Sequence, residues 1–396
     1  MVWWVAERGK VSCGNRGRSA ASGPATVVRE ITMQSDPVYW IHIGLPKTAS
    51  TTIQHFLTSH RDALLQRGVL YPRGIARGAR DAQLHRALGA AVEPESVPWL
   101  AGMLQRFAGT DIVASLLEEV DRTKPETVIL SSEALAFMRR PNLLRHALRG
   151  CEVHILVYLR RQDNFLASFY NQLIKTRLYA ATFEEFLRQN AADAIDLGQY
   201  QITLAMCQYD RLLELWAGAF GPENIVAGVY EDYDLPGGIL RDMAAKMEID
   251  IAGLRLRDAD TNPALQPSML SLKRRVNQLL SSEEERVTCE LLFASNFDGA
   301  TGTKAAHEQI AAEIRRRQTI LSRYQEGNAR VAEKFFNCRP LLFNAPNGHD
   351  SPLPDFGDKD WQDGQHGLAA QMIARLISEV SRFKKDRIGS LPDSAS

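Results

Sequence analysis

The sequence lacks the features of a membrane-spanning, exported or disulfide-stabilised protein. No apolar run approaches the roughly 18 residues that a helix needs to cross a bilayer. The apolar stretch Val2–Val5 is too short for the core of a secretory signal. The five cysteines are odd in number, widely spaced and form no CxxC pair, which favours buried, reduced thiols over disulfides or a zinc site. We therefore expect a cytoplasmic protein without a membrane span.

An excess of charge of one sign is also missing. Lysine plus arginine and aspartate plus glutamate number 47 each among the 396 residues, so the formal net charge is zero. This balance gives no electrostatic reason to expect nucleic acid or a membrane surface as a partner. An anionic ligand would have to be bound by a local group of donors. With 45% apolar and 24% charged residues, the composition is otherwise that of an ordinary globular protein.

The first 36 residues differ in composition from the rest of the chain. They are rich in Arg, Ser, Gly and Ala and lack apolar periodicity, so we expect 1–36 to be a disordered extension. Met33 stands just before the change, and a start codon placed too far upstream is the simplest explanation, with a transit peptide as the weaker alternative. We expect one domain over 37–343, and then a loop, a C-terminal helix and a tail over 344–396.

Short apolar segments alternate with amphipathic helices in the first part of this domain. The expected strands are Val38–Gly44, Thr127–Leu130, Val153–Leu159 and Asn224–Tyr230. Near-continuous apolar strands that alternate with helices predict a parallel sheet covered on both faces, and hence an α/β fold. Ligands of such sheets bind at the carboxyl ends of the strands.

From residue 239 onward the apolar pattern is helical, and 344–367 has the composition of a loop. The expected helices are Ile239–Met247, Met269–Leu280, His307–Tyr324, Ala329–Phe336 and Leu368–Phe383. The sequence thus predicts a helical C-terminal portion.

The loop after the first strand has the composition of a phosphate-binding loop. It reads Gly44-Leu45-Pro46-Lys47-Thr48-Ala49-Ser50-Thr51-Thr52 and leads from a strand into a helix. Unpaired backbone N–H groups, the positive end of the helix dipole, a lysine and several hydroxyls can all be directed at one anion there. The loop is not a Walker A motif, because no Gly-Lys-Ser/Thr stands at the helix start. The alternative is a capped helix start whose hydroxyls serve the first turn.

A second group of polar residues follows the third expected strand. Arg160 leaves the strand end, Asp163 is placed to cap the next helix, and Ser168 lies in its second turn. An arginine and a hydroxyl in this arrangement can bind a second phosphate. The alternative is structural, with Arg160 or Arg161 paired with an acid and Ser168 a small residue on a packed helix face.

Together the two motifs resemble the sulfotransferase family, and closely its bacterial members with a Gly-x-Pro-Lys-Thr-Gly-Thr-Thr type of loop. The resemblance covers roughly 41–247 and includes the segments Tyr209–Trp216, Phe220–Ile225 and Val229–Asp232. It implies a P-loop NTPase-like sheet and 3′-phosphoadenosine 5′-phosphosulfate (PAPS) as co-substrate. It implies that the lysine loop binds the 5′-phosphosulfate and that Arg160 and Ser168 bind the 3′-phosphate. The implied donor-binding residues are Lys47, Thr48, Ala49, Ser50, Thr51, Thr52, Arg160 and Ser168.

Ala49 departs from the family pattern, which usually has glycine at this position. We expect a helical φ at Ala49, which tolerates a methyl group, so that donor binding is only modestly weakened. Ser50 replaces a common threonine and keeps the hydroxyl.

The implied reaction moves a sulfuryl group from PAPS to a hydroxyl or amine of an acceptor. By analogy with phosphoryl transfer, Lys47 neutralises charge on the leaving group, and no carboxylate cluster of Mg²⁺ type accompanies the loop, so no metal is implied. His85 and Glu133 are the candidate general bases, and we favour His85 because a neutral imidazole near pH 7 is ready to accept a proton. Their structural alternatives are a solvated helix residue and a helix cap. His42, on a strand, is expected to be a core residue.

Two other functions stay open. An ATP-dependent kinase is disfavoured by the missing Gly-Lys-Ser/Thr. A nonenzymatic nucleotide-binding module would keep the loop but have neither His85 nor Glu133 near Lys47. The sequence identifies neither the acceptor nor the oligomeric state, although the resemblance favours a carbohydrate hydroxyl as acceptor.

Overall fold

The computed structural model of the protein describes most of the expected domain. The described residues are 36–73, 93, 112–176, 179–189, 195–196, 201–202, 206–231, 235, 237–256, 265, 267–282, 284–285, 287–289, 293, 307–348, 350–351, 353–354 and 364–388. His85, Met33 and the expected N-terminal extension, apart from its last residue, lie outside this part of the chain.

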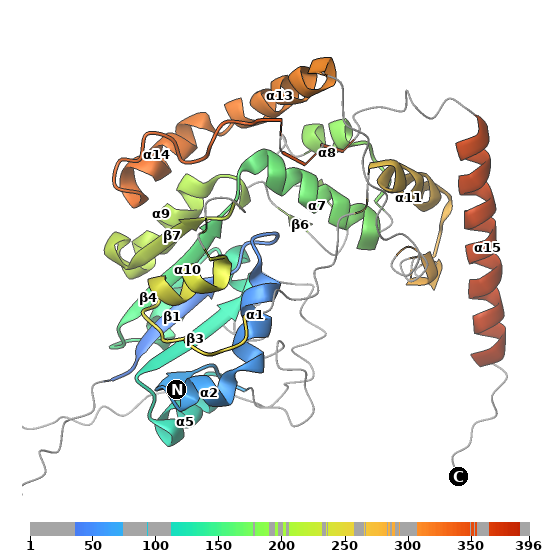
Figure 1. Ribbon diagram of the computed structural model, residues 1–396. Helices are drawn as coiled ribbons and strands as arrows, with labels where there is room; N and C mark the ends of the chain where they lie inside the picture. The colour runs from blue at the N-terminus through green and yellow to red at the C-terminus, as the bar shows by residue number, and fades with distance from the viewer. Residues whose placement is uncertain are drawn as a thin grey trace, which may run out of the picture. The chain divides into compact units, whose positions relative to one another are not determined.

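Five parallel strands form the central sheet (Figure 1). Their order is β2 (Val69–Leu70), β3 (Thr127–Ser132), β1 (Val38–Ile43), β4 (Val153–Leu159) and β7 (Ile225–Val229). All neighbours pair in parallel, and β1 lies between β3 and β4. The expected α/β fold with a central parallel sheet is therefore confirmed, as are its four predicted strands. A separate antiparallel pair, β5 (Ile195–Asp196) and β6 (Gln201–Ile202), was not predicted.

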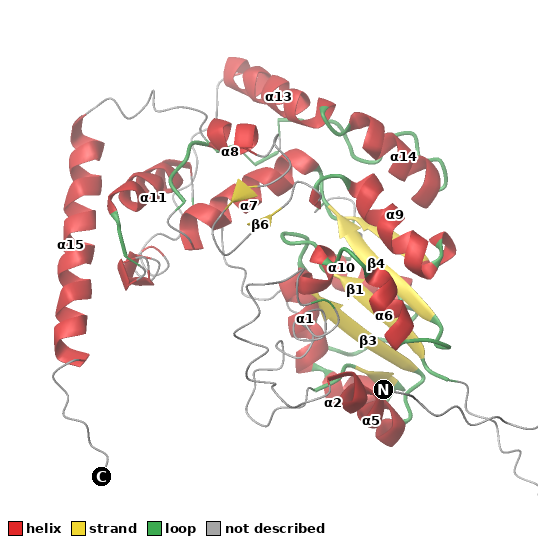
Figure 2. Cartoon of the chain, turned by 180° about the vertical axis from the view of Figure 1, so that it is seen from behind, coloured by secondary structure: helices red, strands yellow, loops and turns green. Residues whose placement is uncertain are grey.

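Helices cover both faces of the sheet, as the near-continuous apolar strands predict (Figure 2). Because successive strand residues point to opposite faces, Ile41 and Trp40 of β1 belong to different apolar clusters. One cluster includes residues of α1 (Ser50–Ser59), α2 (Arg61–Leu65) and α10 (Ile239–Lys246). The other includes residues of α5 (Ile112–Thr123), α6 (Pro141–Ala147) and α9 (Tyr209–Phe220). The short 3-10 helices η3 (Glu133–Phe137) and η5 (Pro222–Asn224) follow β3 and α9.

The remaining helices extend the structure from the end of β4. They are α7 (Gln162–Thr176), α8 (Phe183–Gln189), α11 (Pro267–Leu279), α13 (His307–Ser322), α14 (Gln325–Phe335) and α15 (Gly364–Ile388). Helix α7 packs against α8, α11 and α13, α14 packs against α9, and α15 packs against α11. The expected helical C-terminal portion is confirmed, although α15 extends beyond the predicted Leu368–Phe383 at both ends. No helix in the described ranges is long and apolar enough to cross a membrane.

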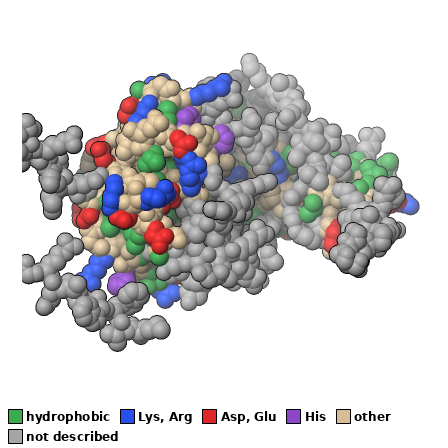
Figure 3. All heavy atoms as spheres, turned by 90° about the horizontal axis from the view of Figure 1, so that it is seen from below, with side chains coloured by type: hydrophobic (Ala, Val, Ile, Leu, Met, Phe, Trp, Pro, Cys, Tyr) green, Lys and Arg blue, Asp and Glu red, His purple; other side chains and the backbone are tan. Residues whose placement is uncertain are grey.

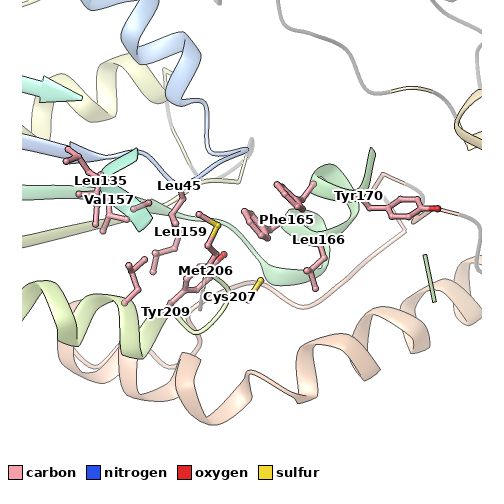
Figure 4. Close-up of a cluster of buried hydrophobic side chains, with 14 of the residues drawn as sticks. Leu45, Leu135, Val157, Leu159, Phe165, Leu166, Tyr170, Met206, Cys207 and Tyr209 are labelled. Carbon is pink, nitrogen blue, oxygen red and sulfur yellow. The ribbon is translucent and has the colours of Figure 1, made fainter. Parts of the chain in front are cut away.

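The apolar core continues from the sheet into α7. Leu45, just after β1, and Leu159, at the end of β4, lie in the same cluster as Phe165 of α7 and Tyr209 of α9 (Figure 4). This shared core fixes the first turns of α7 relative to the strand ends.

On the surface, basic and acidic side chains are interspersed over the described part of the face in Figure 3.

A buried network of charges joins the start of α7 to α13. Arg161, Asp163 and Arg317 are all fully buried. The Asp163 carboxylate accepts hydrogen bonds from Nε and Nη2 of Arg161, at 2.8 and 3.0 Å, and from Nη1 of Arg317. The prediction that Asp163 caps α7 is wrong, because the helix already begins at Gln162. Asp163 instead lies between the buried guanidinium groups of Arg161 and Arg317, where its negative charge offsets their positive charges.

The network also reaches the segment after α14. Asp350 forms an ion pair with Arg161 at 2.7 Å, and the backbone oxygens of Asn344 and Ser351 accept hydrogen bonds from Arg161 and Arg317. At the other end, Glu231 after β7 accepts a hydrogen bond from the backbone N–H of Arg161 at 2.9 Å. Segments far apart in the sequence thus meet where β4 passes into α7.

We expect Asp163→Ala to destabilise the fold by about 3–5 kcal/mol, because it leaves two buried arginines without the carboxylate between them. The free energy of unfolding from urea denaturation measures this loss. Glu184→Ala is the matched control, since Glu184 and its partner Arg188 are both largely exposed and form a weak pair at 3.9 Å. Equal stability of the two variants would contradict a structural role for the network.

Candidate active site

The predicted site residues meet at one edge of the sheet. The loop with Lys47 follows β1, Glu133 follows β3, and Arg160 follows β4. Ile43 of β1 lies directly beside Ser132 of β3 in the parallel register. Since these strands are parallel neighbours, their carboxyl ends lie together, at the position where such sheets bind ligands.

The backbone of the loop between β1 and α1 alternates in handedness. Lys47 has φ 67° and Ala49 has φ 59°, whereas the φ of Thr48 between them is not positive. Alternation of this kind turns successive backbone N–H groups toward one point and forms a concave anion-binding site. Among the hydrogen bonds between described residues, none uses a backbone N–H of residues 47–52 as donor. These groups are free to bind an anion.

The expectation of a helical φ at Ala49 is wrong. Its φ of 59° and ψ of 24° are left-handed, immediately before the first residue of α1. For a residue with a Cβ atom this conformation costs roughly 1–2 kcal/mol. Such strain persists only where the surrounding structure enforces it.

Two of the predicted hydroxyl donors hold this loop in its strained shape. Thr48 and Ser50 are buried, and both donate hydrogen bonds to the carbonyl oxygen of Leu45, at 2.7 and 3.0 Å. Their hydroxyls therefore bind the loop itself, and no side chain caps the start of α1, so the structural alternative of a capped helix start is wrong. Thr52 is also buried. Thr51 is exposed, so its hydroxyl is accessible to a ligand.

Lys47 lies among other charged groups. Burial lowers the pKa of its ammonium group, Glu133 opposes that change, and Lys175 and Arg160 lower the pKa further. Three cations and one carboxylate thus influence one another at the loop. A bound anion would favour the protonated lysine and reverse the shift.

The two adjacent arginines, Arg160 and Arg161, make different contacts. Arg160 Nη1 donates a hydrogen bond to the backbone oxygen of Lys47 at 2.9 Å, and its guanidinium carbon lies 5.5 Å from the ring centroid of Tyr230. Its Nε is buried and has no hydrogen-bond partner in the described part of the chain. Arg161 instead enters the ion network with Asp163. The structural alternative is therefore correct for Arg161, whereas Arg160 contacts the loop after β1.

Ser168 and Lys175 lie on α7, which passes above the loop between β1 and α1 in both ribbon views (Figures 1 and 2). Both side chains are half-buried. Seven residues of an α-helix make almost two complete turns, so Ser168 and Lys175 point to the same side of α7. Lys175 was not predicted, and the only signal in the sequence was its helical spacing from Ser168.

Glu133 is the candidate base that the structure brings to Lys47. The negative charge of Glu133 acts on the lysine, and a Cβ atom at Gly44 would lie only 3.4 Å from Cγ of Glu133. The neighbouring Ser132 caps η3, since its Oγ accepts a hydrogen bond from the N–H of Ala134 at 3.1 Å. His85 lies outside the described residues.

His42 is a core residue, as expected. It is fully buried, and its Nδ1 lies 2.8 Å from Oγ of Ser131 on the neighbouring strand. Burial lowers its pKa to about 4, so the ring is neutral near pH 7. In the described ranges, no group of three or more His, Cys, Asp and Glu side chains is placed to hold a metal ion.

Comparison with known proteins finds partial similarity to a curated protein and to solved structures. No protein-family model matches the sequence. An uncharacterized protein of Archaeoglobus fulgidus is 23% identical over 215 residues, which are 54% of this chain and 54% of that protein, so the match spans about half the length of this relative. The crystal structure of a sulfotransferase from Alicyclobacillus acidocaldarius is similar over 62% of this chain and 90% of that chain, with a TM-score of 0.36 and 16% sequence identity.

We expect Ala49→Gly to stabilise the protein by up to about 1.6 kcal/mol. Relief of left-handed strain contributes roughly 1–2 kcal/mol, and the greater freedom of glycine in the unfolded chain removes about 0.4–1 kcal/mol of that gain. Urea denaturation measures the difference.

Ala245→Gly is the matched control for this variant. Ala245 is exposed within α10, where glycine costs about 1 kcal/mol. If Ala49→Gly lowers the stability as much as Ala245→Gly does, Ala49 is not strained.

Proposed function

We propose that the chain is a sulfotransferase that transfers a sulfuryl group from PAPS to a hydroxyl or amine group of an acceptor. The observation that carries this proposal is the strained loop, in which Lys47 and Ala49 are left-handed and the backbone N–H groups of 47–52 have no partner among the described residues. Strained backbone is concentrated where a ligand uses it. A concave row of N–H groups at a helix start, with a lysine beside it, suits a phosphate or sulfate group.

A donor with two separate phosphate positions suits the residues around this loop. Arg160 touches the loop through the Lys47 carbonyl, and the hydroxyl of Ser168 lies on the helix that follows. In the sulfotransferase resemblance this pair binds the 3′-phosphate, which ATP does not have. The loop also lacks the Gly-Lys-Ser/Thr of ATP-dependent kinases. We therefore propose PAPS, and not ATP, as the donor.

In the proposed reaction the acceptor oxygen or nitrogen attacks the sulfur atom in line with the leaving oxygen. One bond forms between the acceptor and sulfur, the bond between sulfur and the bridging oxygen breaks, and adenosine 3′,5′-bisphosphate leaves with the electron pair. Lys47 and the backbone N–H groups of the loop stabilise the charge that grows on the leaving phosphate. A general base takes the proton that the acceptor loses.

Glu133 and His85 are the candidates for this base. Support for Glu133 comes from its position, since its charge acts on Lys47. A nonenzymatic binding module would not need a carboxylate there, so this position favours an enzyme. For His85, support for this role comes from the sequence alone.

We expect adenosine 3′,5′-bisphosphate to raise the melting temperature much more than ATP does. A ligand that binds only the folded state at 100 times its Kd adds about 2.7 kcal/mol of stability. Ser168→Ala should reduce the effect of the bisphosphate, but it should not change the effect of adenosine 5′-monophosphate, which lacks the 3′-phosphate. Equal stabilisation by the bisphosphate and ATP would refute the proposed 3′-phosphate site.

We expect removal of the base to lower turnover by about 10²-fold or more and to leave nucleotide affinity nearly unchanged, because the base touches the acceptor and not the adenosine. Transfer of label from PAPS into acceptors of a cell extract measures turnover, and titration calorimetry with the bisphosphate measures affinity. The variants are Glu133→Gln and His85→Ala, each the control for the other. Loss of turnover in one variant only identifies the base, and normal turnover in both would show that proton removal does not limit the reaction.

A further inference from the structure

Three contacts fix Arg160 in the turn between β4 and α7. Its Nη1 donates a hydrogen bond to the backbone oxygen of Lys47 at 2.9 Å, and its guanidinium carbon lies 5.5 Å from the ring centroid of Tyr230. Its own backbone oxygen accepts a hydrogen bond from the hydroxyl of Tyr209 at 2.5 Å. The first two contacts hold the side chain of Arg160, and the third holds its backbone.

The hydroxyl of Tyr209 determines where the backbone of this turn lies. Strand β4 ends at Leu159 and helix α7 begins at Gln162, so the carbonyl group of Arg160 belongs to neither element. Among the described residues, Tyr209 is the hydrogen-bond partner of this carbonyl group, and no other residue donates to it. Tyr209 is itself buried, and its ring packs against that of Phe343 at a centroid distance of 6.1 Å. The apolar core thus fixes the tyrosine, and its hydroxyl fixes the residue from which the guanidinium group extends.

The guanidinium group of Arg160 keeps N–H donors for a ligand. It carries several donors in one plane, and within the described part of the chain its side chain makes the single hydrogen bond to Lys47. Its Nε is buried and has no partner there. A buried donor without a partner costs free energy, which favours a ligand that accepts from it. Paired hydrogen bonds to a phosphate group need a guanidinium plane in the correct orientation, and a small displacement weakens them.

We propose that Tyr209 is a positioning residue for the donor, and that its hydroxyl holds Arg160 where the guanidinium group can bind the 3′-phosphate. The inference rests on the proposed function, because it needs a ligand with a 3′-phosphate. Tyr209 acts through Arg160 and does not touch the donor. The loop for the 5′ end is held separately, since Thr48 and Ser50 bind the Leu45 carbonyl. Loss of the tyrosine hydroxyl therefore affects mainly the 3′-phosphate.

The structural alternative is that Tyr209 only joins α9 to the end of β4. Its ring belongs to the larger apolar cluster, and its hydrogen bond would then contribute to stability alone. In that case, removal of the hydroxyl lowers the melting temperature and leaves the preference for a 3′-phosphate unchanged. The proposed role makes the effect depend on the 3′-phosphate.

The test measures the affinities of adenosine 3′,5′-bisphosphate and adenosine 5′-monophosphate by titration calorimetry at low temperature. Tyr209→Phe removes the hydroxyl and keeps the ring in the core, so the variant is expected to fold. We expect the bisphosphate affinity to fall about three- to tenfold, as for the loss of one hydrogen bond, and the monophosphate affinity to change by less than about twofold.

Tyr170→Phe is the matched control. Tyr170 is also buried, and its hydroxyl also donates to a backbone oxygen, that of Ala181, at 2.8 Å. It therefore loses the same kind of hydrogen bond at a position away from Arg160, and it should change neither affinity.

A double variant tests whether Tyr209 acts through Arg160. In Arg160→Met the guanidinium group is gone, so the further change Tyr209→Phe should weaken bisphosphate binding no more. An equal loss with and without the arginine would overturn the inference.

Two more results overturn the inference and differ in what they say of the proposed function. If Tyr209→Phe leaves the bisphosphate affinity unchanged, or weakens both nucleotides equally, Tyr209 does not position Arg160, and the proposed function still stands. If the unchanged protein binds the bisphosphate no more tightly than the monophosphate, the proposed 3′-phosphate site fails, and the inference fails with it.

Discussion

The geometry of the candidate site depends on a single carbonyl oxygen, that of Leu45. This oxygen accepts hydrogen bonds from the hydroxyls of Thr48 and Ser50, which closes the loop on itself. The Leu45 side chain is fully buried in the larger apolar cluster, so the carbonyl cannot move away from the sheet edge. Apolar packing thus fixes Leu45, and its carbonyl oxygen fixes the hydroxyls of Thr48 and Ser50. These two hydrogen bonds in turn maintain the left-handed backbone of Lys47 and Ala49. The free energy that this strain costs is offset by apolar packing some distance from the loop.

The two adjacent arginines after β4 have different roles, one at the candidate site and one in the supporting structure. Arg160 contacts the loop, and Arg161 binds Asp163 and Asp350 in the buried network. Because consecutive residues at a strand end point in opposite directions, one position can serve the ligand while the next anchors the helix. Helix α13 is joined to the start of α7 by hydrogen bonds from Arg317 to Asp163 and Asn164.

Most of the fold could be predicted from the sequence, because its strands and helices are long and strongly patterned. Val153–Leu159 has the predicted bounds, since it is an apolar run that ends at a charged pair. Val69–Leu70 was missed, because two residues show no periodicity. The motif loop could be located, but the handedness of Ala49 could not, since it depends on hydrogen bonds to Leu45. Lys175 was missed because its effect on the pKa of Lys47 depends on the path of α7 above the loop.

The buried network also has a consequence for synthesis on the ribosome. Asp163 is separated from Arg317 by 154 residues, and Arg161 is separated from Asn344 by 183. At about 5–20 residues per second, the strands can pair on the order of ten seconds before these partners emerge. During that interval Arg161 and Asp163 can pair with each other, and Arg161 can bond to Glu231, but Arg317 and Asp350 are not yet available. The nascent chain can therefore assemble its sheet early, while the start of α7 reaches its final environment only after Arg317 and Asp350 have been translated.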